Sequence, residues 1–333
     1  MNMIKRFLPS LFLFGVSNLC MAQSQVTSYL TGDAADVQAV TTGGIMLMGG
    51  STDVDAALRW MISKCGGGDV VVIRSSGADG YNSYLYSLGK VNSVETLILD
   101  SREKSYDSFA VTRIRGAEML FIAGGDQWNY VKYWKDSPVE DAINYLLNTK
   151  KVPVGGTSAG TAILGRIYFA AQNGSVTSEQ ALHDPYHPNV TIQRDSFLLA
   201  PFLANTITDQ HYTQRNRQGR LVTWLARMNS DWSLPVVKGI GVDEKTAVCI
   251  EPDGTAIVYG TNKAFFIRNR RKGPEECKAG LPLSWKRKRK ALEVHTIQGS
   301  SSGEKHFDIV NWKPLKGAVR SYYSVERGKL QAD

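Results

Sequence analysis

The sequence predicts an α/β protein in which helices flank a parallel sheet, with additional strands in the C-terminal part. Short apolar runs alternate with helical patterns from residue 45 to residue 157, as expected for a parallel sheet covered on both faces. A turn of small residues, Gly155 to Gly160, follows the last of these runs and has Ser158 at its apex. Beyond residue 239 short strand patterns follow one another without intervening helices.

The N-terminal residues have the composition of a secretory signal peptide. Lys5-Arg6 precede an apolar run over residues 7–19, and Cys20-Met21-Ala22 offers small residues for cleavage. The run is too short and too interrupted for a permanent membrane span, and the residues before Cys20 do not favour a lipoprotein. We therefore predict a signal peptide over 1–22, a single domain over 23–333, and a secreted or periplasmic protein.

The whole chain has 333 residues and is 43% hydrophobic, so the part after the signal peptide can bury a large core. It predicts the following elements in order. Residues 23–42 form a polar lead-in. Strands are expected at 45–48, 70–73, 96–99, 119–122 and 152–157. The first helix is expected to be capped by Asp53 and to bury Ala56, Ala57, Trp60 and Met61, and further helices are expected at 81–89, 106–115 and 138–148.

The second half begins with a polar, loop-rich insertion over 166–196. A helix is then expected to end near Met228. Strands are expected at 239–244, 247–251, 255–259 and 264–267, and two more between 292 and 312 around a loop at 299–303. No internal repeat or linker divides the chain.

No metal or cofactor is expected. Cys65, Cys249 and Cys277 are too few and too widely spaced for a disulfide framework or a paired zinc motif. Their pairing stays open between free thiols and one bridge. His183 and His187 have a spacing found in metal sites, but the proline between them disfavours a helix.

The net charge of +8 is concentrated in two basic runs, residues 268–272 and 286–290. Such runs can bind nucleic acid, but a secretory signal argues against that partner. We expect either a solvated surface or a strip that faces an anionic polymer or lipid.

Two loops are expected to share one crevice, because active sites of parallel sheets lie at the carboxyl ends of the strands. Gly124 to Gln127 follow one strand, and Thr157 to Ala159 follow another. Ser158 would need a base, a group that orients the base, and backbone donors for an oxyanion. The amide of Ala159 is a candidate donor, and the turn at Gly125 and Asp126 offers a second.

His211 is the candidate base, because it alone among the histidines stands in a dense polar cluster after an apolar segment. Glu244 follows the apolar residues 240–242 and is the candidate orienting group, with Asp243 as its competitor on the opposite face. The nearby arginines suggest recognition of a carboxylate, and the alternative is a solvated helix face. They are Arg215, Arg217 and Arg220.

Four motifs in order resemble cyanophycinase and its relatives in peptidase family S51. They are Gly124-Gly125-Asp126-Gln127, Gly155 to Gly160, Asp209-Gln210-His211 with the three arginines, and Gly241 to Glu244 with Thr246-Ala247. The resemblance covers roughly residues 43 to 310. It implies a fold like that of class I glutamine amidotransferases, which is flavodoxin-like.

The resemblance also implies roles for single residues. Ser158 would be the nucleophile, His211 the base and Glu244 its orienting partner. The residues that would line the substrate pocket are Gln127, Asp209, Gln210, Arg215, Arg217 and Arg220. Members of the family cleave the β-aspartyl-arginine polymer cyanophycin into dipeptides or act on aspartyl dipeptides.

The sequence departs from the family in the insertion at 166–196, in the segment Phe197 to Phe202 and at Tyr212, all of which bear on pocket shape. The leading hypothesis is a secreted serine peptidase that hydrolyses aspartyl peptide bonds through an acyl-enzyme. Its partner would be a peptide or polymer, and a homodimer is left open. The alternatives are a non-catalytic binding protein and an α/β-hydrolase esterase, whose triad order of serine, acid and histidine differs from the order here.

Overall fold

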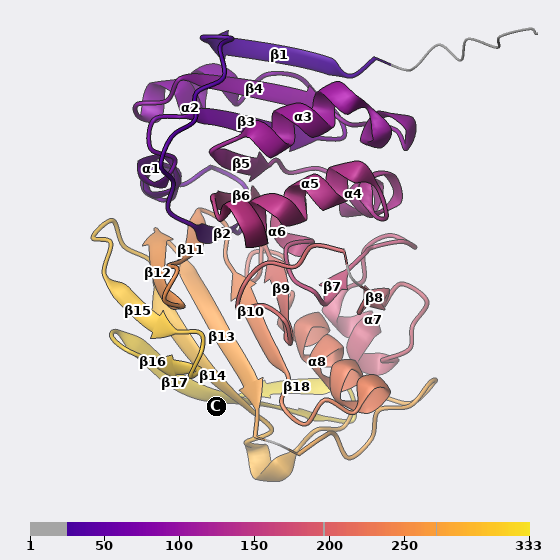
Figure 1. The fold of residues 1–333 in the computed structure, drawn as a ribbon. Coiled ribbons are helices and arrows are strands. Elements are labelled where there is room, and N and C mark those ends of the chain that lie inside the picture. The colour runs from indigo at the N-terminus through magenta and orange to yellow at the C-terminus, as the bar shows by residue number, and fades with distance from the viewer. Residues whose placement is uncertain (1–24, 196, 271) are drawn as a thin grey trace, which may run out of the picture.

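The computed structural model describes residues 25–195, 197–270 and 272–333, so the expected signal peptide lies outside the described residues. Within this part of the chain the larger sheet has ten strands (Figure 1). In sheet order they are β1 (Thr27–Gly32), β4 (Ser93–Ile98), β3 (Asp69–Arg74), β5 (Met119–Ile122), β6 (Pro153–Thr157), β2 (Gly44–Met48), β11 (Thr246–Ile250), β12 (Thr255–Gly260), β15 (Lys305–Asp308) and β16 (Lys313–Pro314).

The predicted fold class is confirmed by the central strands of this sheet, because β4, β3, β5, β6 and β2 pair in parallel. Successive side chains of a strand face opposite sides, and both sides are covered here. Val70 and Val72 of β3 pack with one layer of helices, whereas Val71 and Ile73 pack with the other. The helices are α1 (Asp55–Lys64) and α2 (Asn82–Leu88) in the first layer, and α3 (Ser108–Gly116), α4 (Gln127–Trp134) and α5 (Pro138–Tyr145) in the second.

The C-terminal strands extend this sheet and also build a smaller one beneath it in Figure 1. In sheet order the smaller sheet contains β18 (Lys329–Ala332), β17 (Ala318–Glu326), β14 (Leu292–Gln298), β13 (Lys263–Asn269), β10 (Lys238–Val242) and β9 (Thr206–Gln210). The long helix α8 (Gln218–Trp232) packs against it through Leu221 and Trp224, which are buried with Ile267 of β13.

Two backbone hydrogen bonds hold the residues that follow β9 and β10 against the end of β2, where the site forms. The amide of His211, directly after β9, donates to Gly49 O at 2.9 Å, and the amide of Lys245 donates to Gly50 O at 3.1 Å. Gly49 and Gly50 directly follow β2. The carboxyl ends of strands from both sheets therefore meet at one place.

Several elements differ from the sequence prediction. The lead-in at 23–42 contains β1, an antiparallel edge strand whose exposed residues give no apolar run. The first helix begins at Asp55, and its N-cap is Val54 rather than Asp53. The helix expected over 138–148 stops at Tyr145 and continues as a π-helical turn, η2 (Leu146–Lys150). The insertion holds a two-stranded ribbon, β7 (Tyr168–Phe169) and β8 (Ile192–Gln193), and the helix α7 (Ser178–His183), which begins with a capping box.

Across the described residues, no helix is both long and apolar enough to cross a bilayer. Cys65, Cys249 and Cys277 carry free thiols, of which the first two are buried and the third is partly buried. No group of three or more His, Cys, Asp or Glu side chains in the same residues is arranged to hold a metal ion.

Candidate active site

Ser158 stands on a strained turn between β6 and the short helix α6 (Ala159–Ala162). Its φ of 51° and ψ of −113° lie in a region that L-residues rarely adopt. The glycines on either side are sterically required, since a Cβ on Gly160 would lie 2.2 Å from Ile122 O and one on Gly156 would lie 2.5 Å from the carbonyl carbon of Gly160. The turn therefore needs the G-x-S-x-G spacing found in the sequence.

A chain of two hydrogen bonds runs from this serine to a carboxylate. Ser158 Oγ lies 2.8 Å from His211 Nε2, and His211 Nδ1 lies 2.7 Å from Glu244 Oε1. With the proton on Nδ1, the histidine donates to Glu244, and its Nε2 can accept the hydroxyl proton of Ser158. The three side chains follow the ends of β6, β9 and β10. The sequence predicted the strands at Ser158 and at Glu244, but it did not predict β9 before His211.

The backbone around His211 and Glu244 is tightly fixed. A Cβ on Gly50, whose φ is 98°, would lie 2.5 Å from His211 Cε1, so the imidazole packs directly against the backbone after β2. Glu244 is held at both backbone groups: its amide donates to Gln214 Oε1 at 2.9 Å, and its carbonyl accepts from Asn262 Nδ2 at 2.8 Å. The sequence pattern showed Gly49-Gly50 after a strand but did not indicate this contact.

The competing carboxylate, Asp243, points elsewhere. It is buried and accepts hydrogen bonds from the amide of Thr213 at 2.9 Å and from its hydroxyl at 2.7 Å. Asp243 therefore fixes the loop that follows His211, whereas Glu244 contacts the imidazole itself.

The electrostatics keep the imidazole neutral and the carboxylate charged. Burial lowers the pKa of His211, and the positive charges of Arg215 and Arg217 lower it further, although the hydrogen bond to Glu244 acts in the opposite direction. The hydrogen bond with His211 lowers the pKa of Glu244. A neutral imidazole beside an ionised carboxylate is the state in which histidine can act as a general base.

Ser158 opens into a polar hollow of about 410 Å³. Its lining residues are Gly125, Asp126, Gln127, Trp128, Ser158, Ala171, Gln172, Gly174, Ser175, Gln210, Arg215, Arg217 and Arg220. The structure thus brings together most of the residues expected at the site. Ala159 is buried directly behind the serine, and Asp209 is fully buried outside this lining.

Asp209 instead binds Arg220, whose side chain lines the hollow. Its two carboxylate oxygens accept from Arg220 Nε at 2.8 Å and from Arg220 Nη2 at 2.5 Å. Arg217 donates to Gln210 O at 2.8 Å and lies 3.7 Å from the same carboxylate. Burial and the neighbouring Arg220 lower the pKa of Arg217 to about 10, and the one carboxylate of Asp209 faces both guanidinium groups. The hollow therefore favours an anionic group.

The profile of peptidase family S51 matches residues 78–258, a range that contains Ser158, His211 and Glu244. The chain belongs to peptidase family S51. This is a family of serine-type peptidases.

Among curated relatives of this S51 chain, the cyanophycinase of Nostoc sp. (strain PCC 7120) is 29% identical over 174 residues, which cover 52% of this chain and 53% of that protein. The cyanophycinase of Synechococcus elongatus is 26% identical over 239 residues, covering 68% of each. The chain thus spans about half the length of the Nostoc protein. A peptidase from an acI-B1 Actinobacterium, with a solved structure, has a TM-score of 0.49 and 16% identity, covering 68% of this chain and 91% of that one.

Two parts of the S51 site were not named residue by residue from the sequence, although the insertion was expected to bear on the shape of the pocket. Trp128 of α4 lines the hollow, and so does the segment Ala171 to Ser175 from the insertion. The hydroxyl of Ser175 accepts from Arg220 Nη1 at 3.1 Å, which connects the insertion to the arginine cluster. Small polar residues in a loop carry no signal of this contact, because the ribbon of β7 and β8 and the helix α7 determine where the loop lies.

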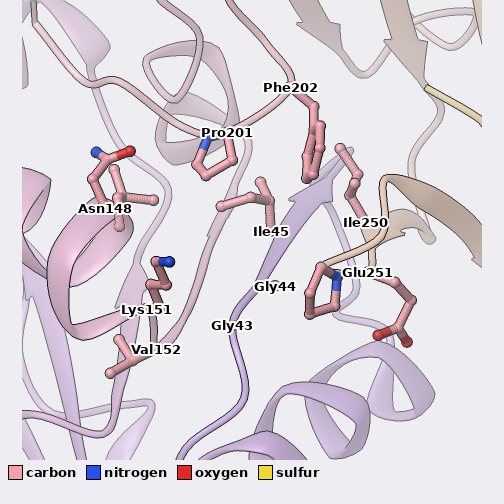
Figure 2. Close-up of a pocket in the computed structure, with 12 residues that line it drawn as sticks. Gly43, Gly44, Ile45, Asn148, Lys151, Val152, Pro201, Phe202, Ile250 and Glu251 are labelled. Atoms are coloured by element: carbon pink, nitrogen blue, oxygen red, sulfur yellow. The ribbon is translucent and has the colours of Figure 1, made fainter. Parts of the chain in front are cut away.

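A second hollow of about 280 Å³ lies at the amino ends of the parallel strands, the opposite edge of the sheet from Ser158. Figure 2 shows Gly43, Gly44 and Ile45 at the start of β2 facing Pro201 and Phe202 across it. None of the expected site residues lines it. The polar hollow at Ser158 is therefore the candidate active site.

The buried ion pair between Asp209 and Arg220 gives a stability prediction. Asp209→Asn is expected to lower the free energy of unfolding by about 3–5 kcal/mol, because Arg220 then stays buried without its charged partner. Urea unfolding followed by circular dichroism measures this change. Glu304→Gln, which breaks the exposed pair with Lys316, is the matched control and is expected to leave the free energy of unfolding nearly unchanged. Equal costs for the two variants would contradict the prediction.

Proposed function

We propose that this S51 chain hydrolyses aspartyl peptide bonds through an acyl-enzyme on Ser158, and that cyanophycin or a related β-aspartyl peptide is its substrate. The proposal rests above all on the hydrogen-bonded chain from Ser158 through His211 to Glu244 inside an arginine-lined hollow. The names of the curated relatives support the substrate class.

In the proposed reaction, Ser158 Oγ attacks the peptide carbonyl while His211 Nε2 takes its proton. Glu244 holds the imidazole in the tautomer that can accept that proton and stabilises the imidazolium that forms. The oxyanion would be bound by the amide of Ala159 together with an amide of Gly125 or Asp126. His211 then gives the proton to the departing amine. Water, activated by the same histidine, cleaves the ester and restores Ser158.

The arginines would fix the substrate by a carboxylate. In a β-aspartyl-arginine unit the amine of the arginine is bonded to aspartate, so its own carboxylate is free. Arg217 only shares the carboxylate of Asp209, at 3.7 Å, because that carboxylate is bound bidentately to Arg220. A guanidinium that is partly buried and incompletely compensated is a strong site for such a group. Gln127 and Gln210, which line the same hollow, offer amides for the peptide groups.

The test is to incubate the mature protein with cyanophycin and with α- and β-aspartyl dipeptides and to identify the products by mass. We expect aspartyl-arginine dipeptides from the polymer and none from the Ser158→Ala variant. Binding of cyanophycin without turnover would support the non-catalytic alternative instead. Labelling of Ser158 by a fluorophosphonate probe provides a second readout of an activated serine. The proposed location is outside the cytoplasm, and detection of a chain that begins at residue 23 in the secreted or periplasmic fraction would support it.

The pH dependence follows from the charges around His211. Because its pKa is lowered, the neutral base persists below the ordinary histidine value of about 6.5, and kcat/KM is expected to fall only below that pH. Arg215→Gln removes a positive charge that disfavours the imidazolium. The pKa of His211 should therefore rise, and the acidic limb should move to higher pH. A pH profile for both proteins with an uncharged ester substrate measures the shift, and a move to lower pH would contradict it.

A further inference from the structure

The two basic runs of the sequence converge at the end of the smaller sheet that lies away from Ser158. Asn269, the last residue of β13, pairs with Leu292, the first residue of β14, and the basic residues lie just beyond these ends. They surround a hollow of about 540 Å³. Its lining contains five cationic side chains, those of Arg270, Lys272, Arg287, Lys288 and Lys290, and one carboxylate, that of Glu275.

The carboxylate of Glu275 accepts hydrogen bonds that fix the loop at residues 286–287. Glu275 accepts from the backbone amides of Lys286 at 2.7 Å and Arg287 at 3.1 Å. The Arg287 guanidinium donates from Nε to Gly273 O at 2.9 Å, and the buried indole of Trp285 donates to Lys272 O at 3.1 Å. The two basic segments are thus bound to each other through backbone groups, which fixes the shape of the hollow.

The turn that presents the second segment is strained. Arg287, Lys288 and Arg289 have φ values of 43°, 56° and 62°, a run of three left-handed residues with no glycine among them. Residues other than glycine rarely adopt this conformation, because their Cβ approaches the following carbonyl oxygen. The turn is held from outside, because Arg289 forms two hydrogen bonds to the carboxylate of Asp333. Strain of this kind accumulates where a site must present its side chains in a set geometry.

The cations of the hollow are poorly compensated. Arg287 lies 3.6 Å from Glu275, whereas within the described residues Arg270, Lys272 and Lys288 have no carboxylate in ion-pair range. Lys290 lies over the ring of Tyr322. Holding like charges around one hollow is unfavourable unless an anion enters it. Arginine forks together with lysine ammonium groups are the side chains that bind phosphate oxygens.

We propose that this hollow binds a compact polyanion, a group with two or more adjacent phosphates. The site is separate from the catalytic one. Lys263, at the other end of β13, donates its amide to Asp243 beside the active site, and the six steps along the strand to Asn269 span about 20 Å. Ligand binding here would therefore attach the protein to a phosphate-bearing molecule without occupying the hollow at Ser158.

Isothermal titration with sodium tripolyphosphate at 150 mM NaCl tests the proposal. We expect one saturable site in the protein that begins at residue 23. Binding should be at least tenfold weaker in the Lys272→Gln/Lys288→Gln double variant. Both side chains are exposed, so the fold should remain intact by circular dichroism. The control is Lys90→Gln/Lys313→Gln, which removes the same charge from exposed sites elsewhere and should bind within twofold of the unmodified protein.

A second arm identifies the source of the phosphates. Sedimentation with vesicles of phosphatidylglycerol and phosphatidylcholine that depends on Lys272 and Lys288 would indicate lipid headgroups, whereas tripolyphosphate binding alone would indicate a soluble polyphosphate. The absence of saturable tripolyphosphate binding would overturn the proposal. Equal weakening in both double variants would overturn it too, because the two runs would then act only as diffuse surface charge.

Discussion

Ser158→Ala is expected to lower kcat on aspartyl peptides by about 10⁴- to 10⁶-fold, the range found when a triad nucleophile is removed. The expectation follows from geometry. The hydroxyl of Ser158 lies 2.8 Å from His211 Nε2, and Ser158 lines the polar hollow. KM should change little, because the arginines that would hold the substrate are untouched. Steady-state kinetics and the loss of fluorophosphonate labelling measure the effect.

The stability of this variant separates chemistry from folding. Ser158→Ala keeps a Cβ at a φ of 51°, so its free energy of unfolding should stay within about 1 kcal/mol of the starting protein. Ser158→Gly removes that Cβ and should be more stable than the alanine variant by about 1 kcal/mol, while being equally inactive. Activity within tenfold of the original in either variant would remove Ser158 from its proposed role.

The elements that position Ser158 could be predicted because their causes are local. The strand at 153–157 is apolar or small along its whole length, and Gly156 and Gly160 are needed by the close contacts of the turn. The rule that loops meet at the carboxyl ends of parallel strands then placed Gly125 beside the serine. The choice of His211 rested on its polar neighbours, and the structure puts it within hydrogen-bond reach of Ser158.

Other features depend on contacts between distant segments, which the sequence does not encode locally. In the sequence, nothing distinguishes Asp209 and Arg220 from polar residues that face a ligand. In the structure, Asp209 is fully buried as the partner of Arg220. Gly50 contacts the ring of His211 only because β2 and β9 end at the same place. The alternation of strands gave no way to tell which sheet each C-terminal strand would join, because an antiparallel strand reads the same in either sheet.

Glu244→Gln is expected to lower kcat by about 10⁴-fold, as the corresponding change does in other triads, because it favours the wrong tautomer of the base. Glu244 Oε1 accepts from His211 Nδ1 at 2.7 Å, and the backbone of Glu244 is fixed by Gln214 and Asn262. A glutamine held there can turn its amide NH₂ toward Nδ1. The proton then sits on Nε2, which can no longer accept from Ser158. Because the hydrogen bond to Glu244 raises the pKa of His211, any residual activity should also persist to lower pH.

Asp243→Asn is the matched control, since it makes the same chemical change at the adjacent residue. Asp243 contacts Thr213 and the amide of Lys263 rather than the imidazole. An amide NH₂ facing the Lys263 N–H would leave a buried donor unsatisfied, so this variant should lose about 1–3 kcal/mol of stability but keep most of its kcat. If Asp243→Asn were the inactive variant and Glu244→Gln stayed within tenfold of the original, the orienting role would belong to Asp243. The two carboxylates are adjacent in sequence and face opposite sides of the chain, so this pair of variants tests the geometry of the site rather than its total charge.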